Sequence, residues 1–161
     1  HRVLQPQKVK RCDDMRATKA ILVGLGILIL SAAVVGAADY ISASKCKMCH
    51  KLQFESWSGL AHAKAFDRLE AADQGNPECL KCHATGGTAD MPGVQCESCH
   101  GPGSDYKSMK VMKDRDASVA AGLVIPDEAT CLGCHTGAPH DQKAFDYAGM
   151  VEKGVHEHKE K

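Results

Sequence analysis

The stretch CESCHGPG, residues 96–103, decides the fold. It contains two cysteines separated by two residues, and a histidine follows the second cysteine directly. The pattern Cys-x-x-Cys-His occurs four times in the 161-residue chain and uses eight of its nine cysteines. A Cys-x-x-Cys pair alone is typical of a zinc half-site or a redox dithiol, whereas the added histidine is typical of c-type haem attachment. Two such pairs already fill a tetrahedral zinc site, so zinc leaves the four histidines unexplained.

The spacing of this motif has a physical reason. Two intervening residues let both sulfurs reach the two vinyl groups along one edge of a porphyrin, and the adjacent imidazole then binds the iron from the proximal side. The sequence therefore predicts four haem c groups. The predicted attachment residues are Cys46, Cys49, Cys79, Cys82, Cys96, Cys99, Cys131 and Cys134. The predicted proximal iron ligands are His50, His83, His100 and His135.

The amino-terminal part of the chain resembles an export signal at residues 15–38. Arg16 and Lys19 precede an apolar run at residues 20–35, and small residues close the run. We expect cleavage close to Asp39 and a periplasmic location; the alternative is an uncleaved membrane anchor, since the run is close to spanning length. Residues 1–14, which include Cys12, are interpreted as an upstream extension, and residues 39–161 as one tetrahaem domain.

The predicted mature domain is acidic and poor in aromatic residues. From Asp39 onward, fourteen Lys and Arg residues face eighteen Asp and Glu residues, a net charge of −4. Such a chain is not expected to bind nucleic acid, but it suits a redox partner with a basic docking patch. Aromatic residues make up only 4% of the chain, so we expect the porphyrins to fill much of the core.

Hydrophobic periodicity and helix-stop signals predict helices over residues 52–72 and 143–158 and a shorter one over 114–122. Gly59 is a candidate kink in the first of these helices. Segments rich in glycine and proline separate them, and no strand pattern is found. The predicted fold class is mainly α with irregular loops, as in a small multihaem c-type cytochrome with a cofactor-dominated core.

The sixth position of each iron distinguishes electron transfer from ligand chemistry. The distal candidates are His62, His156 and His140. His62 follows His50 by twelve residues, about 18 Å along a continuous helix, so it is expected to reach a different haem. His156 and His158 face different directions on a helix, and His156 is preferred because it lies closer to the apolar face. Met109 and Met112 remain alternatives.

The chain resembles the tetrahaem cytochrome c-554 family, best known from ammonia-oxidising bacteria. The stretches that carry the resemblance are KCKMCHKLQFESWSGLAHAKAF (residues 45–66), GVQCESCHGPG (93–103) and FDYAGMVEKGVHEH (145–158). The resemblance implies a mostly helical monomer with haems stacked in near-contact pairs, and distal ligands at His62 and His156. It also implies an open sixth position at the second motif and a third distal histidine where this chain has Val111. His140 or a methionine is then expected to replace that histidine.

The leading hypothesis is a periplasmic electron carrier rather than an enzyme, in which electrons hop between haems. The resemblance implies redox protein partners, with a hydroxylamine-oxidising type of enzyme as one candidate. One alternative is a reductase for a small molecule such as nitric oxide at the haem of His83. The other is a subunit of a polymeric cytochrome filament, in which a neighbouring copy supplies a missing distal ligand.

Overall fold

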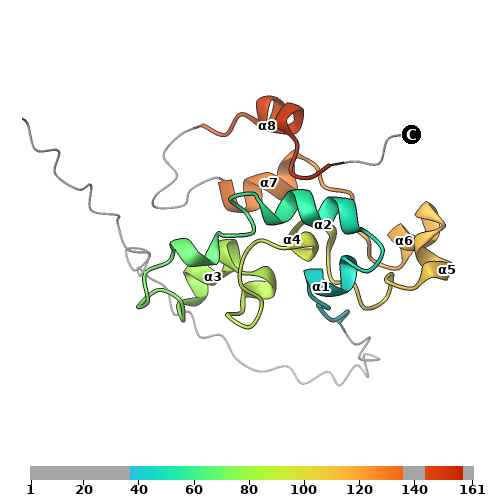
Figure 1. The fold of residues 1–161 in the computed structure, drawn as a ribbon, viewed down its shortest axis with the longest axis horizontal. Helices are drawn as coiled ribbons and strands as arrows, with labels where there is room; N and C mark the ends of the chain where they lie inside the picture. Colours follow the sequence, from blue (N-terminus) through green and yellow to red (C-terminus); the bar gives the residue numbers. More distant parts are fainter. Residues whose placement is uncertain (1–36, 136–143, 158–161) are drawn as a thin grey trace, which may run out of the picture.

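Short helices and loops form the whole of the described structure (Figure 1). This computed structural model describes residues 37–135 and 144–157. No strand is found in these two ranges, where two isolated bridges join Ala84 to Pro92 and to Gly93. The predicted fold class, mainly α with irregular loops, is confirmed. The elements are α1 (Ala43–Cys46), α2 (Lys51–Ser58), η2 (Phe66–Arg68), α3 (Pro77–His83), η3 (Thr85–Gly87), α4 (Cys96–His100), α5 (Met109–Met112), α6 (Arg115–Ala120), α7 (Glu128–His135) and α8 (Tyr147–Lys153).

Side-chain caps define where several helices begin. The Asn76 side chain accepts a hydrogen bond from the Glu78 N–H at 3.0 Å, and Pro77 occupies the first turn of α3. Asp114 caps α6 in the same way, which confirms the short helix expected over residues 114–122. Asp146 caps α8, which ends at Lys153 before Gly154 at φ 71°. Of the helix expected over residues 143–158, the described part is therefore helical only over Tyr147–Lys153.

The single helix expected over residues 52–72 is wrong. Helix α2 ends at Ser58, and turns and the short η2 follow instead. Contacts with a distant loop explain the break, because the Trp57 indole N–H donates to the Val94 carbonyl at 2.9 Å and the Val94 N–H donates to the His62 carbonyl at 2.9 Å. Gly59 eases the change of direction, since glycine is a weak helix former. The 18 Å rise expected between His50 and His62 therefore does not apply.

The buried side chains are few, and several are polar. Among the described residues, the buried apolar ones are Ala43, Cys79, Leu80, Ala84 and Tyr106, and the buried polar ones are Thr85, Gln95, Glu97 and Ser118. No described helix is longer than eight residues, and helices this short depend on packing for their stability. This side-chain core is small, as expected of a fold whose cofactors supply much of the interior.

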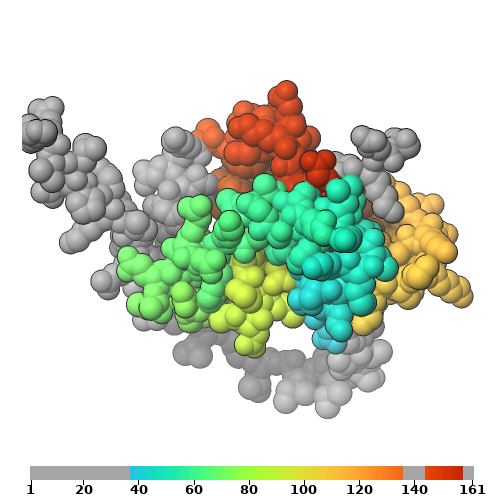
Figure 2. Space-filling model, in the orientation of Figure 1, coloured from blue at the N-terminus to red at the C-terminus, as the bar shows by residue number. Residues whose placement is uncertain are grey.

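The third motif lies at the centre of the arrangement. Helix α1 packs against α4, and α3 packs against η3 and α7. Helix α8 lies at the outer edge, above α2 in the view of Figure 1, and the space-filling view shows the same segment on the outside of the molecule (Figure 2).

Within the described ranges, no helix has the length and apolar character needed to cross a membrane. The apolar run at residues 20–35 lies outside those ranges.

Candidate haem-binding site

All four Cys-x-x-Cys-His motifs adopt a helical turn. In the first, Cys46 ends α1 and His50 lies directly before α2. The second lies at the end of α3, the third forms α4 and the fourth ends α7. Residues three and four apart share one face of a helix. The turn therefore brings two sulfurs and one imidazole of each motif to the same side, as attachment to a single porphyrin requires.

The first and third motifs meet through their cysteines. Helix α1 packs against α4, and hydrogen bonding with Cys96, together with burial, raises the pKa of Cys46. The third motif also lies beside the fourth. Burial raises the pKa of Cys99, and the neighbouring Cys131 raises it further. These contacts place three motifs in the order first, third, fourth.

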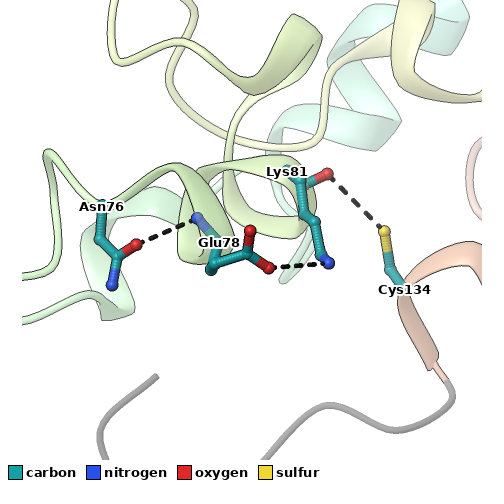
Figure 3. Close-up of polar contacts among 4 residues, drawn as sticks. All are labelled: Asn76, Glu78, Lys81 and Cys134. Atoms are coloured by element: carbon teal, nitrogen blue, oxygen red, sulfur yellow. Dashed lines mark hydrogen bonds and ion pairs between the residues drawn. The ribbon is translucent and has the colours of Figure 1, made fainter. Parts of the chain in front are cut away.

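The second motif completes this series by meeting the fourth. Burial raises the pKa of Cys134 to about 12, and a hydrogen bond with Cys82 contributes to the rise. The Cys134 Sγ also points at the Lys81 carbonyl at 4.0 Å (Figure 3). Within α3, the exposed Lys81 ammonium pairs with the Glu78 carboxylate three residues earlier at 3.1 Å (Figure 3).

His62 lies beside His135, the histidine of the fourth motif. The ring centres of His62 and His135 are 6.0 Å apart. Two imidazoles that bind one metal ion from opposite sides, each at about 2 Å, have ring centres about 6 Å apart. Burial lowers the pKa of His62, with a further contribution from His135. The neutral ring that results is the form that binds a metal ion.

His156 lies beside the proximal histidine of the third motif in a similar way. The ring centres of His100 and His156 are 6.2 Å apart. Burial is the main factor that lowers the pKa of His100, and His156 and His50 contribute. The segment that carries His156 is attached to α2, because the Glu157 N–H donates to the Ser56 hydroxyl at 2.8 Å.

Backbone carbonyls orient three of these imidazoles. The His83 Nδ1–H donates to the Ala65 carbonyl at 2.7 Å, and the His100 Nδ1–H donates to the Val124 carbonyl at 3.1 Å. His156 uses Nδ1 towards the Glu157 carbonyl at 3.0 Å. A proton held on Nδ1 makes Nε2 the basic nitrogen, and such partners fix the tautomer and direction of metal-binding histidines.

The other candidates for distal iron ligands are His140, His158, Met109 and Met112. His140 and His158 lie outside the described residues. Met109 is 63% exposed, and Met112 Sδ accepts a weak hydrogen bond from the Ser118 hydroxyl at 3.9 Å. Cys79 of the second motif is buried, with 2% exposure. No group of three or more His, Cys, Asp or Glu side chains suited to a bare metal ion is found in the described ranges.

Comparison with known proteins shows which family the chain belongs to. The family model described as "Cytochrome c554 and c-prime" matches residues 45–101. Cytochrome c-554 of Nitrosomonas europaea is 33% identical over 175 residues, which cover 83% of this chain and 70% of that protein. The chain belongs to the cytochrome c-554 family. The solved structure of reduced cytochrome c554 from Nitrosomonas europaea aligns with a TM-score of 0.58 and 27% identity over 76% of this chain and 87% of that one.

Membership of the cytochrome c-554 family identifies the cofactor as c-type haem and the function class as electron transfer with redox partners. The residues present fit this cofactor. Each motif offers two thiols and an imidazole on one side of a turn. The rings of His62 and His156 lie at a distance from His135 and His100 that leaves room for one metal ion between each pair. The zinc interpretation of the motifs is therefore set aside.

The sequence interpretation missed several residues that build this site. The Gly93 N–H donates to the His83 carbonyl at 3.1 Å, next to the Val94 bond that holds His62. Glu97 lies inside the third motif and is buried. The motif spacing constrains only its cysteines and histidine, so it gave no indication of a role for Glu97. The positive φ of Gly93, 82°, has no periodicity signal either.

Loss of the Ser56 hydroxyl is expected to loosen the segment that carries His156. In Ser56→Ala the Glu157 N–H loses its acceptor, at a cost of about 1 kcal/mol. We expect a partial high-spin signal in the ferric absorption spectrum. Ser58→Ala is a matched control, because Ser58 lies on the same helix and donates to a carbonyl three residues earlier, as Ser56 does. Equal spectra for the two variants would contradict the role of Ser56.

Proposed function

We propose that this member of the cytochrome c-554 family carries electrons between redox proteins through four covalently bound haems. Bound c-type haem supplies one-electron redox chemistry. The chain attaches the haems, supplies their axial ligands and fixes their relative positions. The observation that carries the proposal is the pair of histidine–histidine spacings, 6.0 Å and 6.2 Å, at two proximal ligands.

The eight cysteines of the four motifs are proposed as thioether sites, and the histidine of each motif as the proximal ligand. The proposed axial pairs are His135 with His62 and His100 with His156. An iron with two histidine ligands has no open position for a substrate, which favours electron transfer at these two sites. His140 remains the proposed ligand for a further iron.

The cysteine contacts support a linear order of attachment sites. The first motif contacts the third, the third lies next to the fourth, and the fourth contacts the second. In this order the first and second motifs lie at the two ends of the series. We propose that electrons hop along it and that redox partners dock near these ends.

The proposed location is the periplasm. Covalent haem attachment in bacteria is completed outside the cytoplasmic membrane, and the predicted signal segment at residues 15–38 agrees with export. The net charge of −4 from Asp39 onward suits partners with basic docking surfaces. A hydroxylamine-oxidising type of enzyme is one such proposed donor, by family analogy.

Intact mass spectrometry tests the number of haems. We expect the purified protein to be heavier than its polypeptide by four haems. Replacing Cys131 and Cys134 by alanine is expected to remove one of them. Glu128→Gln is the control and should leave all four, because Glu128 lies on the same helix as Cys131 and Cys134 but outside the motif. A colourless protein, or zinc bound at these thiols, would overturn the proposal.

A further inference from the structure

Glu97 is a carboxylate buried inside the third attachment motif. Glu97 lies between Cys96 and Cys99 in the sequence, and the residue is only 2% exposed. One oxygen accepts from the Ile41 N–H at 2.9 Å and the Gly103 N–H at 2.7 Å, and the other accepts from Ile41 at 3.1 Å and Ser42 at 2.8 Å. These three backbone donors compensate the cost of burying a charge.

The hydrogen bonds of Glu97 join two attachment motifs. Ile41 and Ser42 directly precede α1, which ends at Cys46, whereas Glu97 itself belongs to α4. Ser42 has φ 72°, the only positive φ of a non-glycine residue in the described ranges. This backbone is unfavourable for a residue with a side chain, and it directs the Ser42 N–H to the carboxylate. Glu97 therefore fixes the first motif against the third.

The charge of Glu97 also reaches both sulfurs of this junction. Hydrogen bonding to Cys96 and burial raise the pKa of Cys46, and the negative charge of Glu97 raises it further. The same charge opposes ionisation of Cys96 and adds to the raised pKa of buried Tyr106. A buried charge acts more strongly on its neighbours than one in water.

We propose that Glu97 is a positioning residue that holds the first and third attachment sites together and lowers the reduction potentials of the two haems bound there. A ferric iron carries one more positive charge than a ferrous iron, so a fixed negative charge nearby favours the ferric state. The inference rests on the proposed attachment of haem at these two motifs.

Redox titration of the holoprotein, followed by absorbance, tests the inference. In Glu97→Gln we expect two of the four one-electron components to move to higher potential, while the other two stay. Glu97→Asp retains the charge and should restore the lower potentials. Asp116→Asn is the control, because Asp116 is an exposed carboxylate in the first turn of α6, a helix that carries no attachment motif. It should move no component.

The outcomes separate this inference from the proposed function. Fewer than four haems on the unmodified protein, measured by mass, would overturn the proposed function. Four haems with unchanged potentials in Glu97→Gln would overturn the role of Glu97 alone. If Glu97→Gln does not retain its haems, Glu97→Asp decides. Full haem content at the original potentials in Glu97→Asp supports the inference. Haem loss in both variants would mean that Glu97 is needed only for folding, which overturns the inference.

Discussion

Replacing His62 by alanine is expected to convert one of four ferric haems from low spin to high spin without loss of covalent haem. The ring centres of His62 and His135 are 6.0 Å apart, so removal of His62 takes away the proposed second axial ligand of that iron. Thioether attachment at Cys131 and Cys134 does not depend on His62. Absorption and electron paramagnetic resonance spectra measure the spin states, and intact mass measures haem content. Relative to the unmodified protein, the high-spin signal should increase by about a quarter of the iron, as one site in four.

Two further measurements sharpen this result. Added imidazole should occupy the vacant position in His62→Ala and restore the low-spin spectrum. His156→Ala should affect a different iron, because His156 lies against His100 rather than His135. The signals of the two variants should therefore add in the double variant. If the ferric spectrum of His62→Ala without added imidazole equals that of the unmodified protein, His62 is not an axial ligand.

Gly93→Ala is expected to destabilise the protein and displace His62 together. A Cβ atom at Gly93 would lie 2.6 Å from the Ala63 carbonyl oxygen and 3.3 Å from that of His62, and the residue has φ 82°. The left-handed backbone costs about 1–2 kcal/mol, and the forced shift adds roughly 1–3 kcal/mol. Denaturant unfolding and ferric spin state measure the two consequences. We expect a lower midpoint and a partial high-spin signal.

Gly87→Ala separates the two contributions. Gly87 has a similar φ, 68°, but no atom lies within 4 Å of a Cβ built there. It should therefore show the backbone cost alone, about 1–2 kcal/mol, with an unchanged spin state. Equal effects of the two substitutions on stability and spectrum would mean that the close approach of Gly93 to the segment of Ala63 has no influence on His62.

The sequence predicted what depends on local spacing. The four motifs and the capped helix at Arg115–Ala120 could be recognised because each depends on residues a few positions apart. The path of residues 59–65 could not, because the bonds of Val94 to Trp57 and His62 come from more than thirty residues away. The pairing of His62 with the fourth motif depends on that path, and so does the contact between Ala65 and His83.

The same limit applies to the polar interior. Thr85 is fully buried, and its hydroxyl donates to the Gly93 carbonyl and accepts from the Gln95 N–H, each at 2.9 Å. Hydrophobic patterning indicates apolar burial, so it gives no signal for a threonine, a glutamine or a carboxylate in the interior. The burial of these residues depends on hydrogen bonds to backbone groups that only the folded chain places next to them.

The attachment of Glu157 to Ser56 spans 101 residues and places His156 against a motif that was synthesised long before it. Ribosomal synthesis therefore delivers every cysteine needed for haem ligation before it delivers this imidazole. A premature stop codon shortly after the fourth motif would leave all four motifs in place but remove His156, the proposed second axial ligand at His100.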